Sequence, residues 1–441
     1  MSAGVAIRMA QALRLGREYH QRHVPLEREI RRRVMWTCFM IDNLVSFVTS
    51  RPRTIQHKAM SIQLPCPPAS FLFGEDYSMP TLGNLTPEKL QTEDLMPFFV
   101  QTLQLWGGVT EEVAEWVIGR GNGSISSTAN DDRRDADIVS HLKTWVSQLP
   151  TRLRWSISGY RAFRLLGGDD LYTLMHLLLH HALCLAGQRF LPHGDDVMIV
   201  ADHAASRPLV EEDEISACRA QAFGIVDIAE ALFADGERGM AILSTPFAGL
   251  ALTGSASVLI WLANAMPMLR SSRPDSGSSI LGEVSEANKK LERVTTILRA
   301  CTRQLRLPSS WLETISFLQD FYAVAYTGNY NDEENSGAVP GNHLSSETTG
   351  EISGGSGVPD SDAVTSAWPL SRQVMMLTSG TLESSATRTQ LAQAQIRSLW
   401  NRVWLQAQIT TPQDWLNSIW GLVDSQCLDD GVGAILDSLE A

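Results

Sequence analysis

Residues 25–52, PLEREIRRRVMWTCFMIDNLVSFVTSRP, carry the clearest structural pattern in the chain. Pro25 suits the first turn of a helix. Glu27 with Arg31, and Glu29 with Arg33, stand one turn apart, where opposite charges support a helix. The closing Ser-Arg-Pro stops the pattern, because the residue before a proline is pushed out of helical geometry. Fifteen residues, 34–48, carry a single charge, Asp42. The stretch therefore predicts one long helix that is largely buried.

Asp42 needs a partner if this helix is buried. A lone carboxylate in an apolar run loses its hydration, which is costly unless a cation or several hydrogen-bond donors face it. The available cations are Arg51, just past the predicted helix end, and an arginine of the preceding run. We expect Asp42 to be a structural anchor that holds the helix against its own exit loop.

The start of the same helix carries a cluster of arginines. A helix places Arg28 and Arg32 on one side and Arg31 nearly opposite Arg33, so the four do not form one stripe. The cluster could bind phosphate or form part of a nuclear import signal. Ion pairs that anchor the start of the helix are the simpler interpretation, and we favour it over contact with nucleic acid.

The rest of the chain also shows the helical period, and no long alternating strand pattern competes with it. An all-α fold is therefore predicted. The apolar stretch 247–269 is long enough to span a bilayer, but it contains polar residues and lacks an aromatic belt, so a buried core helix is favoured over a membrane span. Besides residues 25–52, helices are expected at 4–18, 95–118, 136–149, 171–190, 215–234, 247–266, 283–306 and 311–326.

Charge is distributed unevenly over the 441 residues, whose net charge is −13. Residues 1–60 hold eleven Lys or Arg against four Asp or Glu, a balance of +7, whereas residues 327–441 hold four against fourteen, a balance of −10. The overall charge argues against nucleic-acid binding through the field of the whole chain. No signal sequence is apparent, so the protein is expected inside the cell, with its six widely spaced cysteines reduced.

Common catalytic and metal-binding motifs are missing, including G-x-S-x-G, the P-loop, H-E-x-x-H and the EF-hand loop. His176 and His180 stand one turn apart and could share an ion, with His193 or Asp195 nearby. Partly buried or capping histidines are the favoured interpretation. The acid pairs at 169–170 and 195–196 are interpreted as loop residues rather than as a general acid and base. The chain is not expected to be an enzyme.

The last part of the chain changes in composition. Residues 327–387 are rich in Ser, Gly and acids, and such a segment cannot bury enough apolar surface to offset its ordering entropy, so disorder is predicted. Residues 388–441 are predicted to form a short helical, acidic region, a candidate activation segment. Its candidate contacts with a coactivator are Trp400, Trp404, Trp415, Trp420 and Leu436. Docking of this tail on the helical core is an equally favoured alternative.

The N-terminal third resembles a known regulatory module. GVAIRMAQALRLGRE (4–18), LEREIRRRVMWTCFMIDNLVSFVTSRPRTI (26–55) and SIQLPCP (61–67) resemble, in order, the regulatory middle homology region of fungal zinc-cluster transcription factors. Weaker similarity continues to about residue 326, so residues 1–326 are expected to form this domain in partial form. Met35 and Ser50 depart from the usual Trp and Gly. The residues at signature positions are Arg31, Arg32, Arg33, Trp36, Asp42, Arg51 and Pro52.

The resemblance implies an all-helical module that regulates a transcription factor in the nucleus. The family binds DNA through six closely spaced cysteines that hold two zinc ions, and the cysteines here have other spacings. We therefore expect no cofactor in this chain, and DNA contact only through a missing N-terminal cluster or a partner. The chain begins inside the homology region, so part of the apolar face of residues 4–48 is expected to be exposed or covered, with poor solubility or dimerisation as the result.

Two functions follow from this resemblance. The first is a transcription regulator that controls a metabolic gene set, of which secondary-metabolite genes are one class, through a coactivator. The alternative is a modulator without DNA contact that forms a heterodimer with a full-length family member. Neither function involves a membrane.

Overall fold

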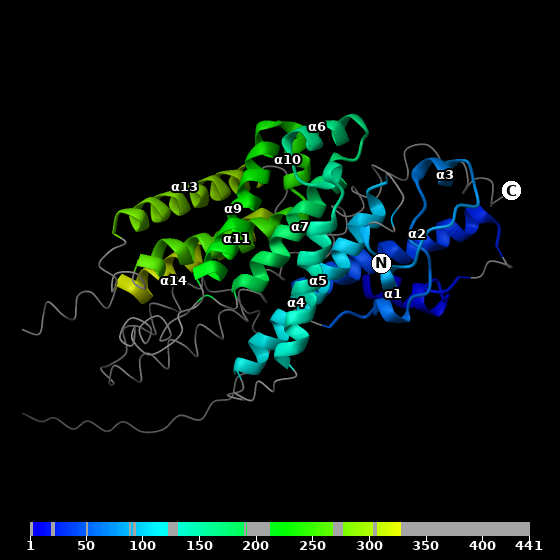
Figure 1. Ribbon diagram of the computed structural model, residues 1–441, viewed down its shortest axis with the longest axis horizontal. Helices are drawn as coiled ribbons and strands as arrows, with labels where there is room; N and C mark the ends of the chain where they lie inside the picture. The colour runs from blue at the N-terminus through cyan, green and yellow to red at the C-terminus, as the bar shows by residue number, and fades with distance from the viewer. Residues whose placement is uncertain are drawn as a thin grey trace, which may run out of the picture.

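The computed structural model describes residues 3–18, 23–49, 52–87, 90, 94–121, 131–188, 191, 212–267, 277–302 and 307–327. Over these residues the fold is all-α, as predicted, and the only β pairing among them is one isolated bridge between Gln63 and Thr81. Figure 1 shows the helices along one long axis, with α1, α2 and α3 at one end and α13 and α14 at the other. The helices are α1 (Ala3–Ala12), α2 (Pro25–Thr49), α3 (Pro68–Leu72), α4 (Met96–Gly121), α5 (Asp131–Gln148), α6 (Ile157–Leu165), α7 (Asp169–Gln188), α9 (Glu212–Ala234), α10 (Glu237–Leu243), α11 (Pro246–Asn264), α13 (Gly277–Cys301) and α14 (Leu307–Thr327).

The helix α11 lies at the centre of the larger bundle. It begins with Thr245, whose hydroxyl accepts a hydrogen bond from the Ala248 N–H, and with a proline at its first position. It packs against α7, α9, α13 and α14. This helix is the one in the described part of the chain that is long and apolar enough to cross a bilayer, and 78% of its apolar window is buried inside the molecule. The prediction of a core helix is therefore confirmed.

The helix α4 connects the two ends of the molecule. It packs against α7 of the bundle and against α2 of the N-terminal end. Trp106 of α4 is fully buried and stacks at an angle on Phe47 of α2, with ring centroids 4.8 Å apart. The two ends therefore share a continuous core.

Within the described residues, every helix predicted from the periodicity is present, with bounds that differ by a few residues. The helix predicted at 4–18 is shorter, because Arg14 takes a positive φ of 53° and the chain turns there. The short helices α3, α6 and α10 were not predicted. Residues 328–441, with the predicted disordered segment and acidic tail, lie outside the described residues.

Candidate functional site

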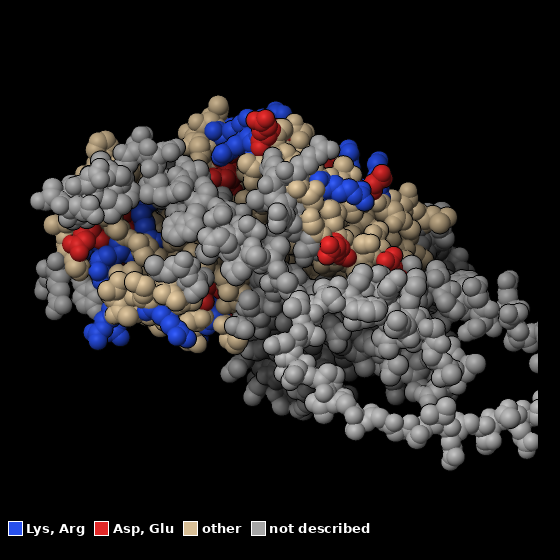
Figure 2. Space-filling view, turned by 180° about the vertical axis from the view of Figure 1, so that it is seen from behind, with Lys and Arg blue, Asp and Glu red and all other residues tan. Residues whose placement is uncertain are grey.

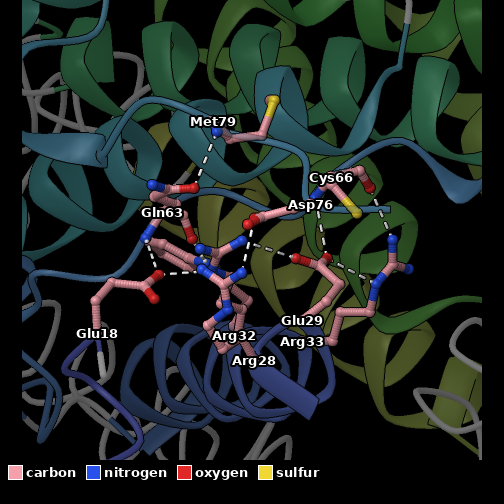
Figure 3. A network of polar contacts seen from close by, with 10 residues as sticks. Glu18, Arg28, Glu29, Arg32, Arg33, Gln63, Cys66, Asp76 and Met79 are labelled. Atoms are coloured by element: carbon pink, nitrogen blue, oxygen red, sulfur yellow. Dashed lines mark hydrogen bonds and ion pairs between the residues drawn. The ribbon is translucent and has the colours of Figure 1, made fainter. Parts of the chain in front are cut away.

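Glu29 lies at the centre of a buried polar network at the start of α2 (Figure 3). Its Oε1 accepts hydrogen bonds from the Cys66 N–H at 2.9 Å and from Arg33 Nε at 2.9 Å. Its Oε2 accepts from Arg32 Nη1 at 3.3 Å. One carboxylate therefore joins two arginines of its own helix to the loop around Cys66, and the predicted pair of Glu29 with Arg33 is confirmed.

A second carboxylate, that of Glu18, continues the network from the segment before α2. Its Oε1 accepts from Arg32 Nε at 2.6 Å and from the Gln63 N–H at 3.0 Å. Burial acts to lower the pKa of Arg32, but the hydrogen bonds and charges of Glu18 and Glu29 outweigh it and raise that pKa. Trp36, also fully buried, donates its indole N–H to the Gln63 carbonyl at 2.8 Å. Segments before and after α2 are thus fixed to the same helix face.

The other arginines of the cluster also contact protein groups. Arg33 donates to the Cys66 carbonyl at 2.8 Å and lies over the Phe71 ring at 4.3 Å. Arg28 pairs with Asp76 at 2.7 Å, and Arg31 donates to the carbonyl of Leu13 at 3.1 Å. Arg28, Arg32 and Arg33 thus pair with carboxylates, which supports the interpretation of the cluster as an anchor for the helix start. Arg31 contacts a carbonyl instead of the predicted Glu27, which pairs with His23.

Asp42 is buried and contacts the exit loop of its helix, although through a different group from those expected. Its Oδ2 accepts a hydrogen bond from the Ile55 N–H at 2.6 Å. Burial raises the pKa of Asp42, while the N–H groups of Ile55 and Thr54 and the charge of Arg53 lower it. The cation beside it is thus Arg53. The arginines of the preceding run contact other groups, and Arg51 lies outside the described residues.

Arg53 joins that exit loop to α4. Its Nε and Nη2 donate to the two carboxylate oxygens of Glu111 at 2.7 and 2.6 Å. Its Nη1 donates to Asn43 at 3.3 Å and to Gln104 at 3.2 Å. Arg53 was not among the residues predicted from the sequence, although it directly follows the signature proline and an arginine near a buried acid is a usable signal. Pro52 itself is exposed.

The histidines of α7 serve packing. His176 donates to the Leu153 carbonyl at 2.8 Å, and His180 donates to the Gln221 side chain at 2.8 Å. His181 accepts from the Trp106 indole at 3.0 Å. Burial lowers the pKa of His176 and of His181 to about 3, so both rings are neutral. Within the described ranges no three His, Cys, Asp or Glu side chains gather as metal ligands; His193 and Asp195 lie outside those ranges.

The acid pair at 169–170 was wrongly predicted to lie in a loop. Both residues open α7 and are buried. Arg238 of α10 binds the Asp169 carboxylate through two hydrogen bonds of 2.9 and 2.8 Å. Although burial acts to raise it, the bound arginine lowers the pKa of Asp169. This ion pair fastens α10 to the start of α7.

Part of the apolar face of residues 4–48 is exposed, in line with expectation. The buried side of this region includes Met35, at the position where the family usually has Trp, together with Cys38, both packed in the core. The described cysteines, from Cys38 to Cys301, are unpaired and buried. Trp400, Trp404, Trp415, Trp420 and Leu436 lie outside the described residues. The exposed large apolar side chains of this region are Val5, Met9, Leu13, Val24, Ile30, Val34 and Val45.

Comparisons with known proteins agree with the resemblance found in the sequence. Residues 2–145 match the fungal specific transcription factor domain. An uncharacterized transcriptional regulatory protein of Schizosaccharomyces pombe is 29% identical over 206 residues, 41% of this chain and 30% of that protein. The Zn(2)-C6 fungal-type transcription factors FTF1c and FTF2 of Fusarium oxysporum f. sp. lycopersici are each 25% identical, over 281 and 282 residues, 58% of this chain and 28% and 25% of theirs.

The chain therefore spans less than a third of the length of these relatives. No solved structure matches it.

Proposed function

We propose that this chain, which carries the fungal specific transcription factor domain in residues 2–145, is the regulatory part of a fungal transcription regulator of the Zn(2)-C6 class. It acts in the nucleus through protein partners and controls a metabolic gene set. The domain organisation proposed is a helical regulatory domain to residue 326, a linker at 327–387 and an acidic tail at 388–441. No catalytic residue, metal or other cofactor is assigned to this chain.

One observation carries the mode of action. The arginines of the signature helix, the strongest basic cluster of the sequence, are occupied by Glu18, Glu29, Asp76 and backbone carbonyls. A surface that binds DNA needs basic groups free to meet phosphate. These arginines therefore help to hold the domain together, and we assign contact with DNA to another part of the factor or to a partner.

The tail supplies the proposed contact with a coactivator. Six acids and no Lys or Arg follow Arg402. Trp415 and Trp420 lie among these acids, and Trp404 precedes the first of them by ten residues. Large apolar side chains between acids suit a segment that binds a groove on a partner.

A reporter assay tests this function. The full chain is fused to an unrelated DNA-binding domain upstream of a reporter gene in a fungal cell. We expect a changed reporter level, which the variant with Trp415→Ala and Trp420→Ala reduces at least about threefold. Phe73→Ala is the matched control, because this aromatic is 81% exposed and lies outside the tail. An unchanged reporter level, or specific DNA binding by the purified chain, contradicts the proposal.

The exposed side chains of α1 and α2 favour a second function, that of a modulator that pairs with a full-length family member. Val5 and Met9 lie one turn apart on α1, Leu13 follows directly after its end, and all three are exposed. A contiguous apolar face is a common protein interface. Co-purification of a tagged full-length relative with the chain, lost in the variant Met9→Ser with Leu13→Ser, supports this alternative. If the relative co-purifies with neither the natural chain nor the variant, this second function is contradicted.

A further inference from the structure

The short helix α6 and the turn that follows it present apolar side chains to solvent. Ile157 is 53% exposed, and Leu165 and Leu166, at the end of the helix, are 90% and 79% exposed. These are high values for leucines in the middle of a folded chain, where such side chains usually help to fill the core. The match to the fungal specific transcription factor domain ends at residue 145, so α6 lies after it in the chain.

The helix α6 is held firmly in this position. The Ser156 hydroxyl caps its start by accepting from the Gly159 N–H at 2.9 Å. Phe163 stacks on Tyr172 of α7, with ring centroids 4.7 Å apart. Tyr160 donates to Asp235 at 2.7 Å. The exposed leucines are therefore presented by a fixed scaffold.

The segment that contains α6 is itself basic. Residues 151–168 contain four arginines and no acid. Arg164 pairs with Asp235, but Arg154 donates to the carbonyls of Leu149 and Ser147, which leave its charge uncompensated. Arg161 is exposed and has no ion-pair partner among the described residues. Figure 2 shows Lys and Arg, with Asp or Glu beside them, at the upper edge of the molecule, the side where α6 and α10 lie in Figure 1.

The apolar and basic groups alternate along one face. Ile157, Arg161 and Leu165 are spaced by four residues and so lie on one side of the helix, with Leu166 beside them. We name these four residues the α6 surface. Its complement is a segment with large apolar side chains at helical spacing and acids between them, since buried apolar area gives affinity and opposite charge gives selectivity.

The chain itself contains such a segment. Trp415, Ile419 and Leu422 follow one another at intervals of four and three residues, the spacing of one helix face. Asp414 and Asp424 flank them, and the segment 412–441 has six acids and no Lys or Arg. It is joined to the end of α14 by residues 328–411, and even a chain of that length without preferred structure would span about 50 Å, enough to reach the far end of the bundle.

We propose that the acidic segment 412–441 of this chain docks on the α6 surface, with its tryptophan face against Leu165 and Leu166 and its acids beside Arg161. A tethered segment binds at a high effective concentration, so even modest contacts keep it in place. This inference does not rest on the proposed function, because its test measures protection of the tail and not transcription.

Hydrogen exchange of the full chain, followed by mass spectrometry, tests the docking. The readout is deuterium uptake by peptides that cover residues 412–424. In the natural chain we expect exchange to be slowed at least about tenfold relative to an unstructured peptide. The variant Leu165→Ser with Leu166→Ser should remove most of this protection. Both side chains are exposed, so the fold should be kept, and circular dichroism checks this.

Two further variants separate the contributions to docking. Arg161→Glu should weaken protection severalfold, and adding Asp414→Arg to it should restore part of the loss, because the charges are then exchanged. Phe73→Ser is the matched control: this side chain is 81% exposed at the end of α3, away from the α6 surface, and should leave protection unchanged. Salt at about 0.5 M should reduce protection, since exposed charges are screened.

Three outcomes would overturn the proposal. The first is a tail that exchanges at the unstructured rate in the natural chain. The second is protection that survives the leucine variant or is lost with Phe73→Ser, which places the tail elsewhere. The third is protection that falls on hundredfold dilution, which shows that the tail of a second copy occupies the α6 surface.

Discussion

Replacing Glu29 by glutamine should destabilise the protein strongly. In the natural chain Glu18 and Glu29 balance Arg32 and Arg33, and Glu29 is only 3% exposed. Glu29→Gln leaves two arginines against one carboxylate in a buried place, and breaking a buried pair costs about 3–5 kcal/mol. Because Arg33 keeps its contacts with Cys66 and Phe71, we expect the lower value, roughly 3 kcal/mol.

Thermal and urea unfolding, followed by circular dichroism, measure this loss. A destabilisation of about 3 kcal/mol corresponds to a fall in Tm of roughly 6 °C or more. Glu27→Gln is the matched control: it lies two residues earlier on the same helix, is 49% exposed and pairs with His23. Exposed pairs of this kind contribute at most about 1 kcal/mol.

A double-mutant cycle shows whether the loss comes from the ion pair. Arg33→Met alone should also destabilise the protein. The loss of stability in the double variant should be smaller than the sum of the two single losses, by at least about 1 kcal/mol. If Glu29→Gln unfolds within about 0.5 kcal/mol of Glu27→Gln, the network does not hold α2 in place and the reasoning fails.

Three other predictions concern stability. Asp42→Ala should cost about 2 kcal/mol, because buried backbone N–H groups lose their acceptor, and an unchanged urea midpoint would contradict this. Burial lowers the pKa of His176 and His181 to about 3, so between about pH 6.5 and 3 only the unfolded chain takes up these protons. The free energy of unfolding should therefore decrease as the pH is lowered from 6.5, by up to about 1.4 kcal/mol per histidine and pH unit. Equal urea midpoints at about pH 7 and 5.5 would refute this. Gly249→Ala should destabilise the protein by about 1–3 kcal/mol, because the added methyl group would overlap an indole ring of α14. Gly282→Ala meets no atom within 4 Å and should stabilise α13 by about 0.5–1 kcal/mol. A reversed order of the two Tm values would contradict both predictions.

The helices could be predicted because their apolar periodicity is strong and long. Residues 25–49 and 246–264 bury most of their side chains, so the pattern is dense enough to show the element. The short helix α6 was missed for the opposite reason. Its outer face carries Ile157 and Leu165 in solvent, which removes the contrast between an apolar and a polar side.

The partners in the polar networks could be predicted only where they are local. Glu29 and Arg33 are one turn apart, so spacing alone predicts the pair. The contacts of Glu29 with Cys66 and of Arg53 with Glu111 join residues 37 and 58 positions apart. Such contacts depend on how the loop folds back, and no local pattern specifies that.

The two anchors of α2 also determine its register. Most of this helix is apolar, and an apolar surface alone would tolerate rotation or a shift by one turn against its neighbours. In any shifted arrangement Glu29 would lose the Cys66 N–H and Asp42 would lose the Ile55 N–H, and each carboxylate would be buried without its donor. The two acids, thirteen residues apart on the helix, therefore make one alignment of α2 far more favourable than its alternatives. The two buried carboxylates thus fix the position of α2 along and around its axis, which its apolar surface alone would not do.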